Sequence, residues 1–173
     1  MSGLPELIQA LDARRTALLS EVGTLRPEEL RASPTPGIWS VLEVVEHLVA
    51  AEQVILQGLP DPATLTPRPR ELRHRLTYPL VWAVLRFGIP VKAPSRRMLP
   101  TGGASLDELR TRWEATYRWL RTYAAGLAPG SDPAVFRHPV CGPLTLRQAL
   151  RLDRLHLEVH ARQIRARGHR GPA

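Results

Sequence analysis

The sequence predicts an all-α protein, a four-helix bundle with a long, partly helical crossover between its second and third helices. Apolar residues recur at steps of three and four in four long segments, and three of these segments begin with a capping-box pattern. No strand-like alternation of any length is present. At 173 residues, 43% of them hydrophobic and 23% charged, the chain is expected to form one domain over residues 1–173.

The first predicted helix begins at Leu4 and ends near Pro27. Its apolar positions follow helical spacing: Leu4, Leu7, Ile8, Leu11, Leu18, Val22 and Leu25. The SPTPG segment that comes later cannot continue a helix. Directly after it, Ser40 and Glu43 form an S-x-x-E capping box, so a second helix is expected from there to about Gln57.

Residues 59–104 form the predicted crossover. Eight prolines interrupt this stretch, although its middle part, roughly 71–87, could form a further helix. A connection of this length allows the third helix to run in the same direction as the second.

Two further capping boxes mark the starts of the third and fourth helices. Ser105 and Glu108 precede the third helix. Thr145 and Gln148 precede the fourth, which is expected to end near Arg167. Four such helices with one long, partly helical crossover make up the predicted bundle.

The formal net charge is +8, but the basic residues are scattered along the chain and many alternate with acidic ones. A nucleic-acid partner is therefore not expected, because phosphate binding needs clustered positive charge. Apolar stretches such as 80–89 fall short of the roughly 20 residues needed to cross a bilayer, so no membrane partner is expected. The N-terminal segment lacks the basic-then-apolar order of a secretory signal, which predicts a cytoplasmic location.

The last helix carries two histidines, His156 and His160, four positions apart. The charged residues of this helix share one face, which must meet water: Arg147, Arg151, Arg154, Glu158, Arg162 and Arg165. At about 100° per residue, both histidines point away from that face and toward the core. Side chains at this spacing have Cβ atoms about 5–6 Å apart, which suits joint coordination of a metal ion about 2.0–2.1 Å from each nitrogen.

The second helix repeats the pattern with His47. Its polar face contains Glu43, Glu46, Ala50, Gln53 and Gln57, and His47 lies on the opposite, apolar stripe. Each buried imidazole needs a polar partner, and the sequence offers few acids that would be buried with it. A shared cation would satisfy all three histidines, and a histidine-rich hydrogen-bonded core is the alternative. Cys141 is the only cysteine, so a multi-thiolate zinc site is excluded.

Three polar neighbours of these histidines each allow two interpretations. Glu43 lies one turn before His47 and can either orient its imidazole or serve only the capping box. Asp153 and Gln163 can either anchor imidazole N–H groups or simply lie at the edge of the polar face. Trp39, at the start of the second helix, is expected to fill core space.

The stretches WSVLEVVEHL (39–48) and HPVCGPLTLRQALRLDRLHLEVHARQI (138–164), separated by the crossover and the third helix, resemble the DinB-like superfamily of bacterial four-helix-bundle proteins. The resemblance covers almost the whole chain. It implies a divalent metal held by one histidine of the second helix and an H-x-x-x-H pair of the last. In this sequence these ligands fall on His47, His156 and His160.

Three neutral imidazoles leave at least one coordination position of a divalent ion open, as in catalytic sites, and zinc and nickel both suit such ligands. The resemblance implies thiol-dependent S-transferases, isomerases and metal-dependent hydrolases. A metal-dependent thiol S-transferase or hydrolase is therefore expected, with a small electrophile and a low-molecular-weight thiol as partners. The alternative is a non-enzymatic metal-binding protein of the stress response. No general acid or base is assigned.

Two further expectations concern protons and self-association. Imidazole binds metal only when it is neutral, so metal affinity should fall below about pH 6. The apolar crossover, which contains Trp82, Leu85 and Phe87, exceeds what one small bundle is expected to cover, and a homodimer is predicted from it.

Overall fold

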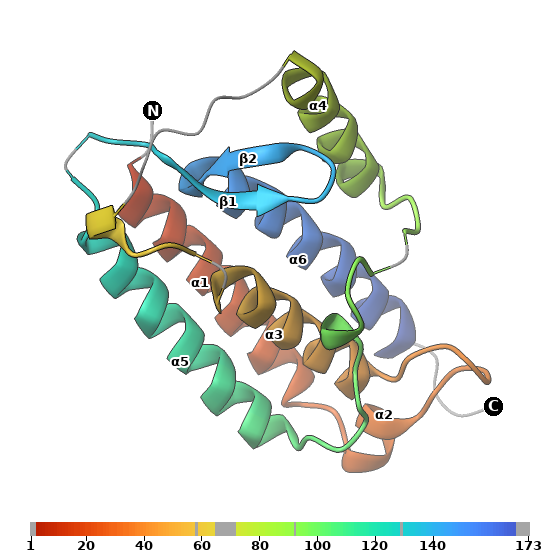
Figure 1. Cartoon of the computed structure of the whole chain (residues 1–173). Coiled ribbons are helices and arrows are strands. Elements are labelled where there is room, and N and C mark those ends of the chain that lie inside the picture. Colours follow the sequence, from red (N-terminus) through yellow and green to blue (C-terminus); the bar gives the residue numbers. More distant parts are fainter. Residues whose placement is uncertain (1–2, 58, 65–71, 92, 129, 169–173) are drawn as a thin grey trace.

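Four long helices form the predicted bundle in the computed structural model, which describes residues 3–57, 59–64, 72–91, 93–128 and 130–168 (Figure 1). These helices are α1 (Leu4–Val22), α3 (Val41–Gln57), α5 (Leu106–Ala125) and α6 (Leu146–Gly168). Contacts between side chains fix their directions. Arg14 and Glu21 of α1 pair with Glu158 and Arg165 of α6, so these two helices run in the same direction.

The helices α3 and α5 also run in the same direction, as the length of the crossover allowed. Glu52 of α3 accepts from Trp113 of α5, and ten residues farther along α5 Tyr123 donates to the carbonyl of Pro60, which follows the end of α3. Arg15 of α1 pairs instead with Glu114 of α5, while Arg110, one turn earlier in α5, donates to the Leu19 carbonyl. These two helices are therefore antiparallel.

All three predicted capping boxes are present. In the box that starts α3, Glu43 accepts from the Ser40 backbone N–H at 2.7 Å, and the Ser40 hydroxyl accepts from the Glu43 N–H at 3.2 Å. The same reciprocal pattern joins Ser105 to Glu108 and Thr145 to Gln148. Each box satisfies backbone donors that the first helical turn leaves without partners.

The first helix is shorter than the sequence predicted. It ends at Val22, and Pro27 begins a separate short helix, α2 (Pro27–Arg31). Proline suits this first helical position because its missing N–H would have no partner there. Leu25, counted as the end of the apolar stripe, still packs against the main core.

The crossover contains the further helix that the sequence allowed, α4 (Leu72–Phe87), between two short 3₁₀ turns, η1 (Pro62–Thr64) and η2 (Arg96–Met98). Three partly buried residues on the inner side of α4, Tyr78, Val81 and Leu85, pack against a small second core. That core consists of Cys141, Leu144 and Leu152. None of the helices in the described ranges is long and apolar enough to cross a membrane.

An antiparallel hairpin, β1 (Ala134–His138) and β2 (Gly142–Thr145), lies between α5 and α6 in the chain, where the sequence shows no strand-like alternation. Its strands are five and four residues long, too short for an alternating pattern to stand out. Gly142 has a φ of 66°, and a Cβ at this position would overlap the ring of His74. The hairpin therefore needs glycine there, and its second strand leads directly into the capping box of α6.

The bundle core also contains acids, although the sequence offered few candidates. Glu52 is 5% exposed, and its Oε2 accepts from Trp113 Nε1 at 2.8 Å. Its Oε1 and the Tyr117 hydroxyl, both buried, have no hydrogen-bond partner among the described residues. Burial, together with the negative charge of Asp153, raises the pKa of Glu52 well above its usual value. Burial likewise raises the pKa of Asp153 to about 7.

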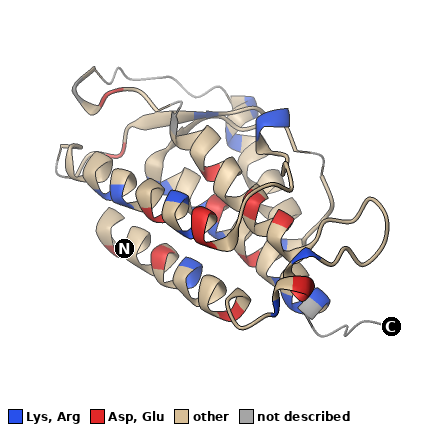
Figure 2. Ribbon diagram, turned by 90° about the horizontal axis from the view of Figure 1, so that it is seen from below, with Lys and Arg blue, Asp and Glu red and all other residues tan. Residues whose placement is uncertain are grey.

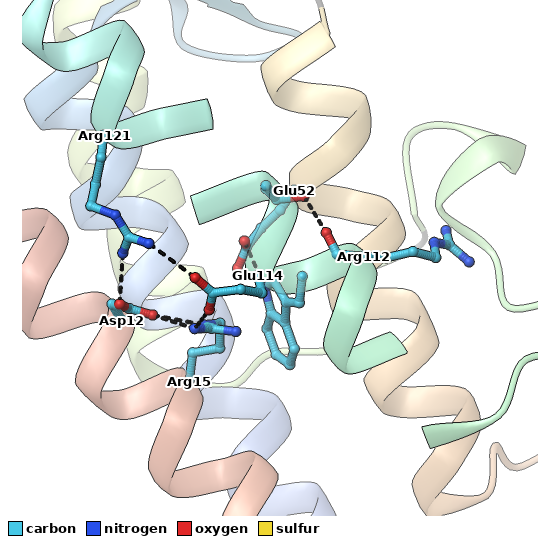
Figure 3. Close-up of polar contacts among 8 residues, drawn as sticks. Asp12, Arg15, Glu52, Arg112, Glu114 and Arg121 are labelled. Carbon is cyan, nitrogen blue, oxygen red and sulfur yellow. Dashed lines mark hydrogen bonds and ion pairs between the residues drawn. The ribbon is translucent and has the colours of Figure 1, made fainter. Parts of the chain in front are cut away.

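The partly buried Asp153 acts on Glu52 through its charge, a role that was not among the two considered for it from the sequence. Arginines lie next to the pair. Arg15, 4% exposed, donates to Asp12 and to Glu114, and Arg121 reaches the same two acids (Figure 3). The guanidinium of Arg15 also lies 4.8 Å from the centre of the Tyr117 ring.

Replacing Glu52 with glutamine should stabilise the protein at alkaline pH. A raised pKa in the folded state favours folding below about pH 4.5, the ordinary value, and that contribution is lost as pH rises toward the folded pKa. Glutamine keeps an oxygen for Trp113 and never ionises. We expect the melting temperature of E52Q at pH 8 to exceed wild type by about 2–8 °C, for roughly 1–2 kcal/mol, with little or no gain at pH 4.5.

The matched control for this measurement is Glu6→Gln, which removes the same charge at an exposed position. The opposite result would be a melting temperature of E52Q that is lower than that of wild type by the same amount at pH 8 and at pH 4.5. It would show that Glu52 stabilises the protein as a hydrogen-bond acceptor and that burial of its charge does not destabilise it.

Candidate metal centre

The three predicted histidines come together where α3 packs against α6. The Nε2 atom of His156 lies 3.3 Å from Nε2 of His47 and 3.1 Å from Nε2 of His160. One nitrogen from each ring lies within 4.8 Å of the others, and the described residues hold no other group of three or more histidine, cysteine or acidic side chains so placed. The rings meet edge to face, with interplanar angles of 69° to 89°.

Hydrogen bonds on the outer nitrogens set the orientation of two rings. Nδ1 of His47 donates to the Met98 carbonyl at 2.6 Å, and Nδ1 of His160 donates to Oε1 of Gln163 at 2.8 Å. A neutral imidazole with its proton on Nδ1 has a free lone pair on Nε2. Both Nε2 lone pairs therefore face His156, and the anchoring role considered for Gln163 is confirmed.

Hydrogen bonding within the cluster cannot satisfy all three Nε2 atoms. If His156 carries its proton on Nε2, it can donate that proton to Nε2 of His47 or to Nε2 of His160, but not to both. The nitrogen that receives no proton then faces His156 without a hydrogen bond. A common cation satisfies all three at once. Nitrogens that share an ion at about 2.0–2.1 Å, with coordination angles of roughly 90–110°, lie about 3.0–3.4 Å apart, and the two separations from His156 fall in this range. The nitrogens of His47 and His160 lie within 4.8 Å of each other and would have to approach to about 4.2 Å or less around a bound ion. The residues present fit a metal ion.

Burial keeps the three imidazoles neutral. It lowers the pKa of His47, against the opposing effect of the bond to Met98. Burial, and then the proximity of the other two rings, lowers the pKa of His156 well below its usual value. Burial and the charge of His47 lower the pKa of His160 to about 4. The lone pairs needed for coordination are therefore available at neutral pH without removal of protons.

The end of the crossover covers His47, and Glu46 holds it there. The Glu46 carboxylate accepts from the Thr101 hydroxyl at 2.6 Å and from the Gly102 N–H at 2.9 Å. Burial acts to raise the pKa of Glu46, but these bonds outweigh it and lower the pKa. The sequence placed Glu46 on a solvent-facing side of the helix, which was wrong because the crossover folds over that side. By these bonds Glu46 holds in place the segment of the crossover that contains Met98, whose carbonyl accepts from His47.

Glu43 and Trp39 take simpler roles beside the cluster. The capping-box bonds of Glu43 confirm the structural interpretation of this residue. Trp39 is partly buried, packs against the main core, and places its ring 4.9 Å from that of His47. The predicted core role of Trp39 is confirmed, and its indole also packs beside His47.

A shallow groove of about 350 Å³, which sequence reasoning did not find, is lined by Gln163, the hydrogen-bond partner of His160. Its lining residues come from the α2–α3 loop and the end of α6: Pro34, Thr35, Ile38, Gln163, Ala166 and Arg167. Nη1 of Arg167 is buried and has no hydrogen-bond partner among the described residues. Burial lowers the pKa of Arg167, and its positive charge helps to depress the pKa of His160. Arg167 therefore places a positive charge at the wall of the groove.

Comparisons with known proteins agree with this architecture. A model of the DinB superfamily matches residues 10–164. The crystal structure of TT2238, a four-helix bundle protein, is similar in fold, with a TM-score of 0.53 and 23% identity over 94% of this chain and 98% of that one. No match was found among curated protein sequences.

Zinc binding should persist to lower pH than the sequence suggested. An exposed imidazole protonates near pH 6.5, but the folded-state pKa values are lowered, and the ligands stay neutral until about pH 4 at His160. By the same linkage, the metal-free protein should lose stability as pH falls from 6.5 toward 4. Titration calorimetry with zinc should give affinities at pH 7.5 and 5.5 that agree within about tenfold, with a steep loss near pH 4.

The synthetic peptide of residues 154–163, in which the same histidine pair is exposed, serves as the comparison and should already lose most of its affinity between pH 7.5 and 5.5. A fall of a hundredfold or more in the protein over that interval would mean that its histidines titrate like exposed ones.

Proposed function

The chain belongs to the DinB superfamily, and from this premise we propose that it is a metal-dependent S-transferase or hydrolase whose divalent ion, zinc or nickel, is held by His47, His156 and His160. The observation that carries the proposal is the convergence of three imidazole nitrogens whose lone pairs cannot all be satisfied by one another. The partners proposed are a small electrophile and either a low-molecular-weight thiol or water.

The donor set supports a catalytic rather than a structural ion. Structural zinc sites use four protein ligands, whereas three neutral imidazoles leave a position for an exogenous ligand. When bound in this way, a divalent ion lowers the pKa of a water ligand toward about 7 or keeps a bound thiol deprotonated. No carboxylate joins the three histidines among the described residues.

The residues of the chain supply orientation and charge. The Met98 carbonyl and Gln163 fix the proton of two rings on Nδ1, which holds their Nε2 lone pairs toward the common point. The guanidinium of Arg167, which lines the adjacent groove, would bind the carboxylate of an anionic thiol or electrophile. A groove with a charged donor beside the site favours an enzyme over the alternative, a metal-binding protein of the stress response.

Replacing His47 with alanine should separate activity from folding. Loss of one of three ligands should lower turnover by about a hundredfold or more, as happens when an electrostatic catalyst is removed. The bundle should remain folded, because its capping boxes and apolar core do not depend on the metal. The assay follows consumption of a model electrophile with added thiol, and circular dichroism of the same samples reports folding.

His138→Ala serves as the control, since it removes an imidazole that lies in the hairpin and outside the cluster. Its Nδ1 accepts from the backbone N–H groups of Val140 and Cys141, so circular dichroism is recorded for this variant as well. Unfolding of H47A, together with no metal-dependent reaction of the wild type with any thiol or water, would favour the non-enzymatic alternative.

Replacing Arg167 with glutamine should impair only anionic co-substrates. Mercaptoacetate carries a carboxylate and 2-mercaptoethanol does not, so KM for the first should rise about tenfold while KM for the second should stay within about twofold. Arg162→Gln, an exposed arginine one turn earlier on α6, is the matched control. Equal effects of R167Q on both thiols would remove Arg167 from substrate binding.

A further inference from the structure

The outer side of α4 exposes an unusual amount of apolar surface. Eleven large hydrophobic side chains are exposed among the described residues, and seven of them lie between positions 72 and 91. These seven are Leu72, Leu76, Leu80, Trp82, Phe87, Ile89 and Val91. Four are at least 66% exposed, namely Leu72, Leu76, Phe87 and Val91. Contiguous apolar surface of this kind marks a site of interaction.

Helical geometry arranges the exposed residues of α4 in one stripe. Leu72, Leu76, Leu80 and Phe87 fall within about 80° of each other around the axis, on the side opposite to Val81 and the other inner residues. The inner side packs against the small second core beside the hairpin and α6. We call the exposed stripe, formed by these four residues, the outer face of α4. Nothing in the described chain covers it.

The basic residues are scattered along the chain, but the net positive charge is concentrated in the crossover sequence that contains α4. Residues 62–106 contain eight arginine or lysine residues and one glutamate, a net charge of +7. The rest of the chain contains sixteen basic and fifteen acidic residues, a net charge of +1. Exposed Arg75 and Arg86 lie along one edge of the stripe and exposed Arg73 along the other. The helix itself contains no acidic residue. Elsewhere, Figure 2 shows basic and acidic positions interspersed along the helices of the bundle.

We propose that the outer face of α4 binds the surface of an anionic lipid bilayer, with the helix lying in the plane of the interface. A helix that presents leucine and aromatic side chains between arginines matches this environment, because the apolar groups enter the acyl boundary while the guanidinium groups meet lipid phosphates. The protein would bind peripherally, and this proposal revises the sequence-based expectation of no membrane partner, which considered only segments that cross a bilayer.

Charge distinguishes this partner from the two alternatives. In a homodimer formed through the outer face, the arginines of one α4 would face those of the other with no acid on either helix to pair with them. Leu85, one basis of the predicted homodimer, faces inward and is partly buried. A nucleic acid would pair with the arginines but would leave the leucines and Phe87 without an apolar partner.

Sedimentation of the full chain with lipid vesicles tests the proposal. The probes are vesicles of phosphatidylcholine alone and vesicles containing about one third phosphatidylglycerol, at 0.15 M salt. We expect binding to the anionic vesicles at least tenfold tighter than to the neutral ones. Substitution of the stripe, Leu76→Ser with Phe87→Ser, and of its edge, Arg75→Gln with Arg86→Gln, should each weaken that binding at least tenfold.

Two control variants remove the same chemistry elsewhere. Trp119→Ser removes an exposed aromatic side chain from α5, and Arg31→Gln with Arg118→Gln removes two exposed charges from α2 and α5. Both should bind vesicles as wild type does, and circular dichroism confirms folding of every variant. Three results would overturn the proposal: no binding to anionic vesicles, equal weakening by the control variants, or a homodimer in light scattering that dissociates when Leu76 and Phe87 are replaced.

Discussion

Three imidazole nitrogens that point at one another inside a helical bundle form the constraint on which the rest of this site depends. Protons on Nδ1 of His47 and His160 leave two lone pairs directed at His156, which can donate to only one of them. Such an arrangement is costly without a shared cation, because buried polar atoms need partners. The surrounding residues nevertheless hold the rings in place, which is the behaviour expected of a site arranged in advance for an ion.

The folding of the bundle and the orientation of the rings are connected through α3. Almost every residue from Val41 to Val49 is buried, since α3 packs against α5, α6 and the end of the crossover. Glu46 ties that end of the crossover to the helix, and His47 then receives the Met98 carbonyl. Farther along α3, Glu52 meets Trp113 and the charge of Asp153. The helix α3 thus contributes to two buried polar clusters, one of neutral histidines around His47 and one of acids around Glu52.

The sequence was sufficient for features set by local spacing. Helical periodicity turned His47, His156 and His160 inward, and capping boxes located the starts of α3, α5 and α6. The remaining features depend on contacts between distant segments. The Met98 carbonyl is a backbone atom that any residue type supplies, and Glu46 and Glu52 are buried because α3 has neighbours on nearly all sides. The hairpin strands are too short to show a period, and the excess of positive charge in the crossover emerges when basic and acidic residues are counted by segment.

X-ray absorption spectroscopy of the zinc-loaded protein tests the metal centre most directly, because it counts the ligand atoms around the ion. The convergence of His47, His156 and His160 predicts three imidazole nitrogens at about 2.0–2.1 Å, with any further ligand a light atom. A spectrum fitted by one imidazole or none, or one that requires a sulfur ligand at about 2.3 Å, would contradict a three-histidine site.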